Sequence, residues 1–157
     1  MRPGRRAALA AGVACAAYGV LHLYWALGGE LLLDESPGGR EIVESTPGAV
    51  ANAAVIALAA IGIALAVATV RARGLPRLLV VGVPALIGVL MLLRAASYAA
   101  GDVANLTGAG DGSTYEARWD LFLWSPLFAA WGVAWGLAAV AARRRNAGPS
   151  GENDERR

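Results

Sequence analysis

Two ionisable side chains, His22 and Arg94, stand inside otherwise apolar stretches of this chain and are its strongest candidates for chemistry. An imidazole can exchange a proton near neutral pH, and a guanidinium binds carboxylates, phosphates or carbonyl oxygens. A charged side chain at the centre of a bilayer costs about 2.5–3.5 kcal/mol on insertion scales. Because of that cost, both residues are expected to face other protein groups.

Helical spacing gives both residues aromatic and polar companions at one depth. Tyr18 and Trp25 would share a helix face with His22, and Tyr98 would share one with Arg94. At a rise of 1.5 Å per residue, both ionisable groups would lie about 10 Å below the outer membrane boundary. The residues predicted to line an outward-facing polar pocket at this depth are His22, Trp25, Asn52, Arg94, Tyr98, Asp120 and Trp124.

The roles of the two ionisable residues stay open at this point. Arg94 could bind an anionic or carbonyl group, with His22 as its hydrogen-bond or proton partner. Alternatively, Arg94 could snorkel to Asp102 or to lipid phosphate, while His22 bridges two helices. The single histidine and the single cysteine, Cys15, predict neither bis-histidine haem ligation nor an intramolecular disulfide, and no metal or cofactor is expected.

Four long apolar stretches must position these side chains. Each is long enough to cross a bilayer core of about 30 Å as a helix of roughly 20 residues. The predicted spans are about residues 7–29, 49–70, 78–100 and 120–142. With a hydrophobic content of 57%, they predict an all-α polytopic membrane protein in which residues 1–145 form a four-transmembrane-helix bundle. The polar residues 146–157 are predicted to form a disordered cytoplasmic tail.

Helix ends and packing motifs are also visible in the sequence. Gly28–Gly29 is expected to end the first span in a left-handed cap, and Ser45–Pro47 to begin the second. Pro84 and Pro126 remove backbone donors within spans three and four, which predicts kinks. An aromatic stripe on span four is expected to serve packing or interface anchoring rather than cofactor stacking. Small residues that would permit close helix approach are Gly132, Gly136, Ala60, Ala64 and Ala68.

The arginines predict the orientation of the chain in the membrane. Nine arginines flank the ends of the spans on one side and two lie in the loops on the other. By the positive-inside rule both termini should be cytoplasmic. The arginines lie at membrane-flanking ends rather than on one basic face, which argues against a nucleic-acid partner. The absence of lysine, with abundant Ala and Gly, suggests a GC-rich bacterial genome and hence the bacterial inner membrane.

Two segments resemble a known family. These are His22–Gly29 (HLYWALGG) and Arg118–Pro126 (RWDLFLWSP), which, with four spans in one short chain, resemble the bacterial membrane family called domain of unknown function 3995. The resemblance covers nearly the whole chain except the tail. It implies a four-helix integral membrane protein, and it brings no established activity.

Three functions remain under consideration. The favoured one is non-catalytic: binding of a lipid or small amphiphile, or of a membrane partner, which includes a second copy of this chain. A membrane-embedded enzyme, such as an isomerase for an apolar substrate, would use His22 and Asp120 in acid/base roles. A transporter or channel subunit would need a polar path through the inner halves of the spans, which are almost entirely apolar.

Overall fold

The structure, a computed structural model, describes residues 3–71 and 76–146. These residues form helices and connecting turns without a strand, as expected for an all-α protein. The elements are α1 (Pro3–Ala26), α2 (Gly39–Glu44), α3 (Thr46–Arg71), η1 (Leu78–Gly82), α4 (Val83–Leu106), α5 (Thr114–Trp119), η2 (Asp120–Trp124) and α6 (Ser125–Asn146), where η1 and η2 are π-helical turns. Most of the tail, residues 147–157, lies outside the described residues.

Four helices are long and apolar enough to cross a membrane. They are Pro3–Ala26, Thr46–Arg71, Leu78–Leu106 and Thr114–Arg145. The last two are longer than the predicted spans 78–100 and 120–142, because each continues into polar residues at the same end of the molecule. These extensions matter for the site described below.

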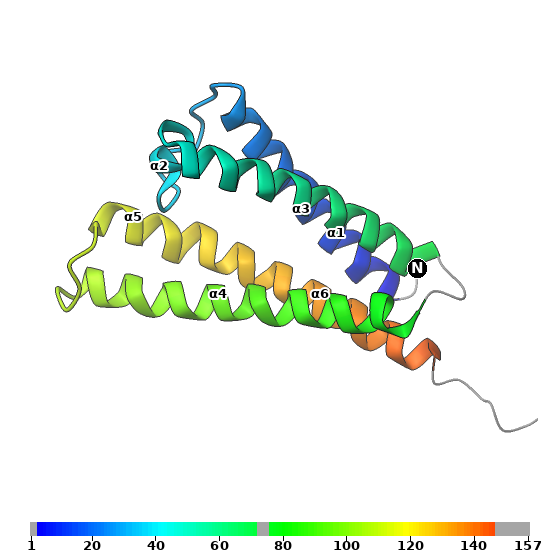
Figure 1. The fold of residues 1–157 in the computed structure, drawn as a ribbon. Coiled ribbons are helices and arrows are strands. Elements are labelled where there is room, and N and C mark those ends of the chain that lie inside the picture. Colours follow the sequence, from blue (N-terminus) through cyan, green and yellow to red (C-terminus); the bar gives the residue numbers. More distant parts are fainter. Residues whose placement is uncertain (1–2, 72–75, 147–157) are drawn as a thin grey trace, which may run out of the picture.

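The helices pair as two hairpins, α1 with α3 and α4 with α6, and the hairpins join mainly along α1 and α6. Figure 1 shows the hairpins close together near the N-terminus and splayed apart at the opposite end. In the part of the chain that the structure describes, α3 packs on the second hairpin mainly through η1. The result is an open arrangement in which α6 is the central helix.

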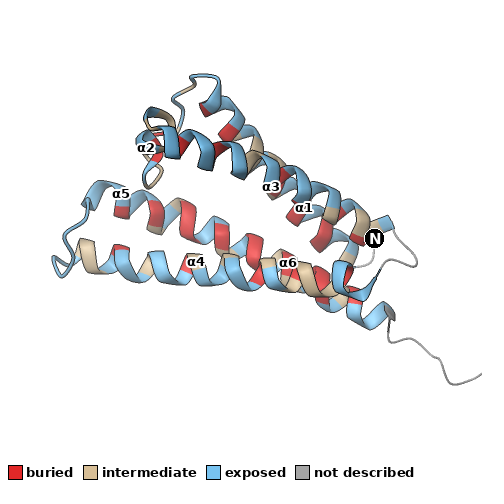
Figure 2. Ribbon diagram, in the orientation of Figure 1, coloured by how far each residue is buried: buried red, intermediate tan, exposed pale blue. Residues whose placement is uncertain are grey.

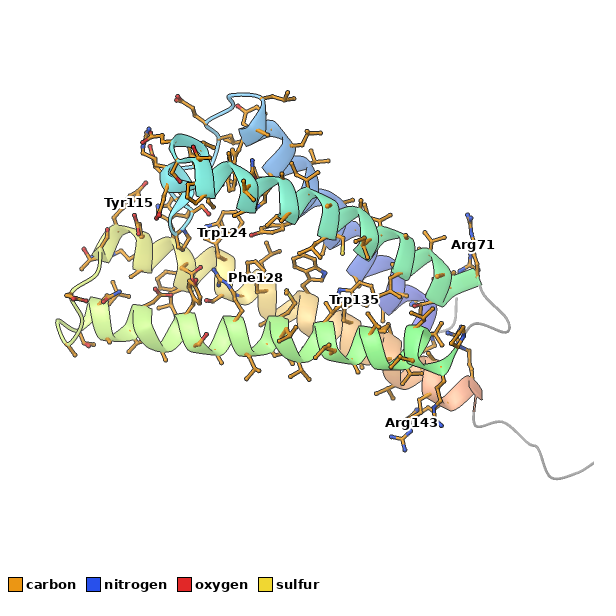
Figure 3. The ribbon with its side chains drawn as sticks, viewed as in Figure 1. Arg71, Tyr115, Trp124, Phe128, Trp135 and Arg143 are labelled. Carbon is orange, nitrogen blue, oxygen red and sulfur yellow. The ribbon has the colours of Figure 1, made fainter. Side chains whose placement is uncertain are left out.

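The two ends of the molecule differ in charge. Arg71 and Arg143 lie together at one end, and Tyr115 lies at the other (Figure 3). We call the first the arginine-rich end, since its described residues also include Arg5, Arg6, Arg77, Arg144 and Arg145. We call the second the acidic end, since its loops and short helices carry two arginines, Arg40 and Arg118, against the seven carboxylates of Glu30, Asp34, Glu35, Glu41, Glu44, Asp111 and Glu116.

An aromatic stripe of η2 and α6 fills the space between the hairpins. Trp124, Phe128 and Trp135 extend from this helix toward the first hairpin (Figure 3), and Trp135 is completely buried. They pack in one core with the small residues Ala11, Cys15 and Ala66. The buried positions face between the helices and the outward faces are exposed (Figure 2), as packing rather than cofactor stacking would require.

Glycines allow the paired helices to approach closely. A Cβ at Gly88 of α4 would lie 2.9 Å from the carbonyl oxygen of Gly132 and 3.1 Å from the backbone nitrogen of Gly136. The predicted Gly132/Gly136 motif therefore serves contact within the chain. Ala60 and Ala64, by contrast, are exposed on α3.

Local signals at the helix ends have the expected effect. Gly28 ends α1 with a φ of 89°, a left-handed conformation that glycine adopts without steric cost. Ser45 Oγ accepts a hydrogen bond from the Gly48 backbone N–H at 3.0 Å and caps α3.

Pro84 and Pro126, the prolines within predicted spans three and four, each follow a π-helical turn. The N–H of Ser125, just before Pro126, donates to the carbonyl of Asp120, and the N–H of Val83, just before Pro84, donates to that of Leu78. Such turns insert one extra residue into a helix and rotate the side chains that follow. In span four, the turn contains Asp120 and Trp124.

Candidate functional site

Arg94 and Asp120 form a two-point ion pair between α4 and η2. Arg94 Nη2 lies 2.7 Å from Asp120 Oδ1, and Nη1 lies 3.2 Å from Oδ2. Ser125 Oγ donates to Oδ2 at 2.9 Å, and the Asp120 side chain is completely buried. This fork is the strongest geometry available to a guanidinium and a carboxylate, and it neutralises both charges.

Two aromatic rings enclose the guanidinium of Arg94. Its central carbon lies 4.1 Å from the centroid of the Tyr98 ring and 4.3 Å from that of Phe128. Both distances suit a cation–π interaction. Arg94 therefore points into the protein, where its charge is already paired, and does not extend to Asp102 or to the lipid surface.

His22 and Asn52 form a second polar pair, between α1 and α3. His22 Nδ1 lies 2.6 Å from Asn52 Oδ1, and the Asn52 amide donates to the His22 carbonyl at 3.2 Å. With the proton on Nδ1, the ring donates to Asn52 and bridges the two helices. His22 Nε2 is buried without a hydrogen-bond partner.

Aromatic rings connect the two polar pairs. The Tyr18 ring lies 4.5 Å from the His22 ring and 5.4 Å from the ring of Phe128, which in turn contacts Arg94. On the other side of His22, the Trp25 ring lies at 4.8 Å. His22 and Asp120 have separate hydrogen-bond partners. His22 pairs with Asn52, and Asp120 pairs with Arg94 and Ser125.

Glu35 links the two hairpins at the acidic end through hydrogen bonds. Trp124 Nε1 donates to the Glu35 carbonyl at 2.6 Å, and the Tyr115 hydroxyl donates to Glu35 Oε1 at 3.2 Å. In the same loop the exposed Arg40 pairs with Asp34, whose hydrogen bond and charge raise the pKa of the guanidinium.

A pocket of about 400 Å³ opens at the acidic end beside the Arg94–Asp120 pair. Its walls come from the end of α4, from α5 and the turn before it, and from the loop of the first hairpin. They include Pro37, Tyr98, Gly101, Asp102, Asn105 and Glu116. Of the seven residues predicted to line a pocket, Tyr98 is the one that contributes to this wall.

Asp102 is one of the pocket residues that the sequence interpretation left outside its candidate set. It is 8% exposed, and its Oδ2 atom has no hydrogen-bond partner. A signal was present, since Asp102 is four residues after Tyr98 and eight after Arg94 on one helix face. The sequence interpretation placed Asp102 on that face only as a partner for Arg94, whereas the structure places it on α4, which continues to Leu106, in the pocket wall.

Metal binding has no cluster of ligands to support it in the described residues. No group of three or more His, Cys, Asp or Glu side chains is placed there to hold an ion. Asp120 is instead paired with Arg94 and Ser125, and His22 with Asn52.

In the part of the chain that the structure describes, four helices in two hairpins are long and apolar enough to cross a membrane, and this defines the class as an all-helical protein with the span pattern of a polytopic membrane protein. The chain belongs to the family described as "Protein of unknown function (DUF3995)", which matches residues 13–135. This confirms the resemblance seen in the His22–Gly29 and Arg118–Pro126 segments. No curated protein and no solved structure matches the chain.

Proposed function

We propose that this protein is a non-catalytic bacterial inner-membrane protein that holds a lipid or small amphiphile in the pocket at its acidic end. The observation that carries the proposal is the position of the pocket. It opens next to the buried Arg94–Asp120 pair, at the end of four membrane-length helices. A ligand there could place a polar group in the pocket and an apolar chain along the exposed apolar helix faces.

Charge supports an outward orientation of the pocket. The arginines gather at the opposite end of the helices, and such clusters remain on the cytoplasmic side. Both termini would then be cytoplasmic, and the pocket would open at the outer leaflet. An amphiphile in that leaflet could enter sideways from the membrane.

The hydrogen-bond partners favour binding over catalysis. A general acid or base must be able to reach a reacting atom and change its protonation state. Asp120 is buried in an ion pair and His22 is bound to Asn52, so neither is free for that role. The pocket wall, in contrast, includes Asp102, whose Oδ2 atom has no hydrogen-bond partner.

Filling the pocket tests the proposal directly. A Cβ at Gly101 of α4, or at Gly136 of α6, would meet nothing within 4 Å. Gly101→Leu should therefore occupy the pocket without forcing the helices apart, and Gly136→Leu is the matched control away from it. Native mass spectrometry of each purified protein, after incubation with a lipid extract of the host membrane, would reveal bound amphiphiles.

We expect adducts on the wild type and on Gly136→Leu, and their loss from Gly101→Leu, at similar thermal stability of all three proteins. Equal adducts on the wild type and Gly101→Leu would overturn the proposal. So would the absence of adducts from all three.

A further inference from the structure

We propose that the pocket at the acidic end selects a cationic head group, an amine or quaternary ammonium, over an anionic one. This inference rests on the proposed ligand-binding function and adds the chemical class of the ligand. The argument depends on which charges near the pocket are already paired.

Arg94, which stacks on the pocket residue Tyr98, is already paired with Asp120. Both oxygens of the Asp120 carboxylate bind the Arg94 guanidinium, at 2.7 and 3.2 Å, and Tyr98 covers one face of that cation at 4.1 Å. An anionic ligand would have to displace the buried Asp120 carboxylate, which would leave it without a counter-charge at high cost. Arg94 is therefore a poor anchor for an anion.

Asp102 is left without a cation of its own. Arg94 pairs with Asp120, and the carboxyl group of Asp102 lies near enough to that of Asp120 for the two to interact, through a hydrogen bond when one of them carries a proton. Asp102 is more than nine-tenths buried, lines the pocket, and has an oxygen without a hydrogen-bond partner. A buried carboxyl group in this position needs either a proton or a positive partner, and a ligand cation in the pocket would stabilise the ionised form.

The remaining lining groups suit the same ligand. Glu116 adds a second carboxylate at the exposed rim, and none of the described residues in the wall is basic. The Tyr98 ring is also part of the wall, and aromatic faces attract ammonium groups. Asn105 and Ser113 offer oxygen acceptors to the N–H groups of an amine.

Two probes with the same alkyl chain and opposite charge test this inference. Dodecyltrimethylammonium and dodecanoate would each be titrated into the purified full-length protein in dodecyl maltoside, with binding followed by native mass spectrometry. The wild type should bind the cationic probe at least about tenfold more tightly, as expected for a charge-assisted contact. Asp102→Asn should lose most of that preference, and Glu30→Gln, in the loop outside the pocket wall, is the matched control.

The outcomes separate the charge inference from the proposed function. If Gly101→Leu abolishes binding but the wild type prefers dodecanoate, the pocket binds a ligand and the charge inference is wrong. Equal binding of the cationic probe by the wild type and Asp102→Asn would also overturn the charge inference, as expected if Asp102 carried a proton. Binding of neither probe, with no adduct from the lipid extract, would overturn the proposed function itself.

Discussion

Arg94 illustrates how a charged side chain is accommodated inside this bundle. It keeps its charge, pairs with Asp120 through two hydrogen bonds, and contacts two aromatic rings. Ser125 binds the same carboxylate, so the polar groups satisfy one another before any ligand arrives. The pair therefore joins α4 to the π-helical turn η2, and Arg94 also contacts the pocket residue Tyr98.

Removing one member of the pair should destabilise the protein strongly. Arg94→Leu would leave Asp120 buried without a counter-charge, at a cost of about 3–5 kcal/mol. The double variant Arg94→Leu/Asp120→Leu removes both charges and should be more stable than Arg94→Leu alone. Thermal unfolding in detergent measures both effects. Arg40→Leu, which removes an exposed pair with Asp34, is the control and should change little. Wild-type stability of the Arg94→Leu protein would contradict the structural role of the pair.

Helix pairing in the second hairpin depends on backbone contact at glycine. Gly88 has no space for a side chain, since an added Cβ would meet the backbone of Gly132 and Gly136. A π-helical turn precedes Pro126 in the partner helix and brings Asp120 and Trp124 to buried positions. Glycine packing and the π turn thus determine how α4 and α6 present their polar residues to each other.

Adding a methyl group should affect stability differently at Gly88, which packs against another helix, and at Gly101, which does not. Gly88→Ala would force α4 and α6 apart and should cost about 1–3 kcal/mol of stability. Gly101→Ala lies on the same helix with nothing within 4 Å of the added Cβ, and it should keep or slightly raise stability, because alanine is the better helix former. Thermal unfolding of the two variants side by side is the measurement. A Gly88→Ala protein as stable as Gly101→Ala would show that the helices can move apart freely.

Charge is distributed unevenly along the length of the four long helices. Arginines gather where the hairpins converge, and carboxylates gather where the hairpins splay apart and Glu35 links them. The pocket lies at the splayed end, against the second hairpin. This polarity predicts both the side of the membrane on which the pocket opens and the direction from which a ligand arrives.

Cysteine labelling should reveal the orientation. Cys15 is buried and can be replaced by alanine, so that one new cysteine reports from each end. Asp111→Cys at the acidic end should react with a membrane-impermeant maleimide in intact spheroplasts. Pro76→Cys at the arginine-rich end should react only after the membrane is permeabilised. The reverse pattern would place the pocket in the cytoplasm and contradict the proposed orientation.

Several properties of this protein follow from the sequence because they depend on local patterns. Span length and hydropathy predict four membrane helices, and the cost of an unpaired charge in lipid predicts that Arg94 turns inward. Gly28 and Ser45 end and begin their helices as expected, because caps depend on neighbouring residues. The prediction that His22, Asn52, Arg94 and Asp120 lie at one depth rests on the rise per residue of a helix.

The partners of those residues were decided by the tertiary structure. Asp102 and Asp120 were both available to Arg94, and only the packing of α4 against η2 selects Asp120. His22 binds Asn52 because α3 is the neighbour of α1. Asp102 does not pair with Arg94 and instead lines a pocket whose walls could not be read from the predicted ends of the spans. Local sequence determines depth along a helix, but the direction in which a side chain points toward other helices depends on how all of them pack.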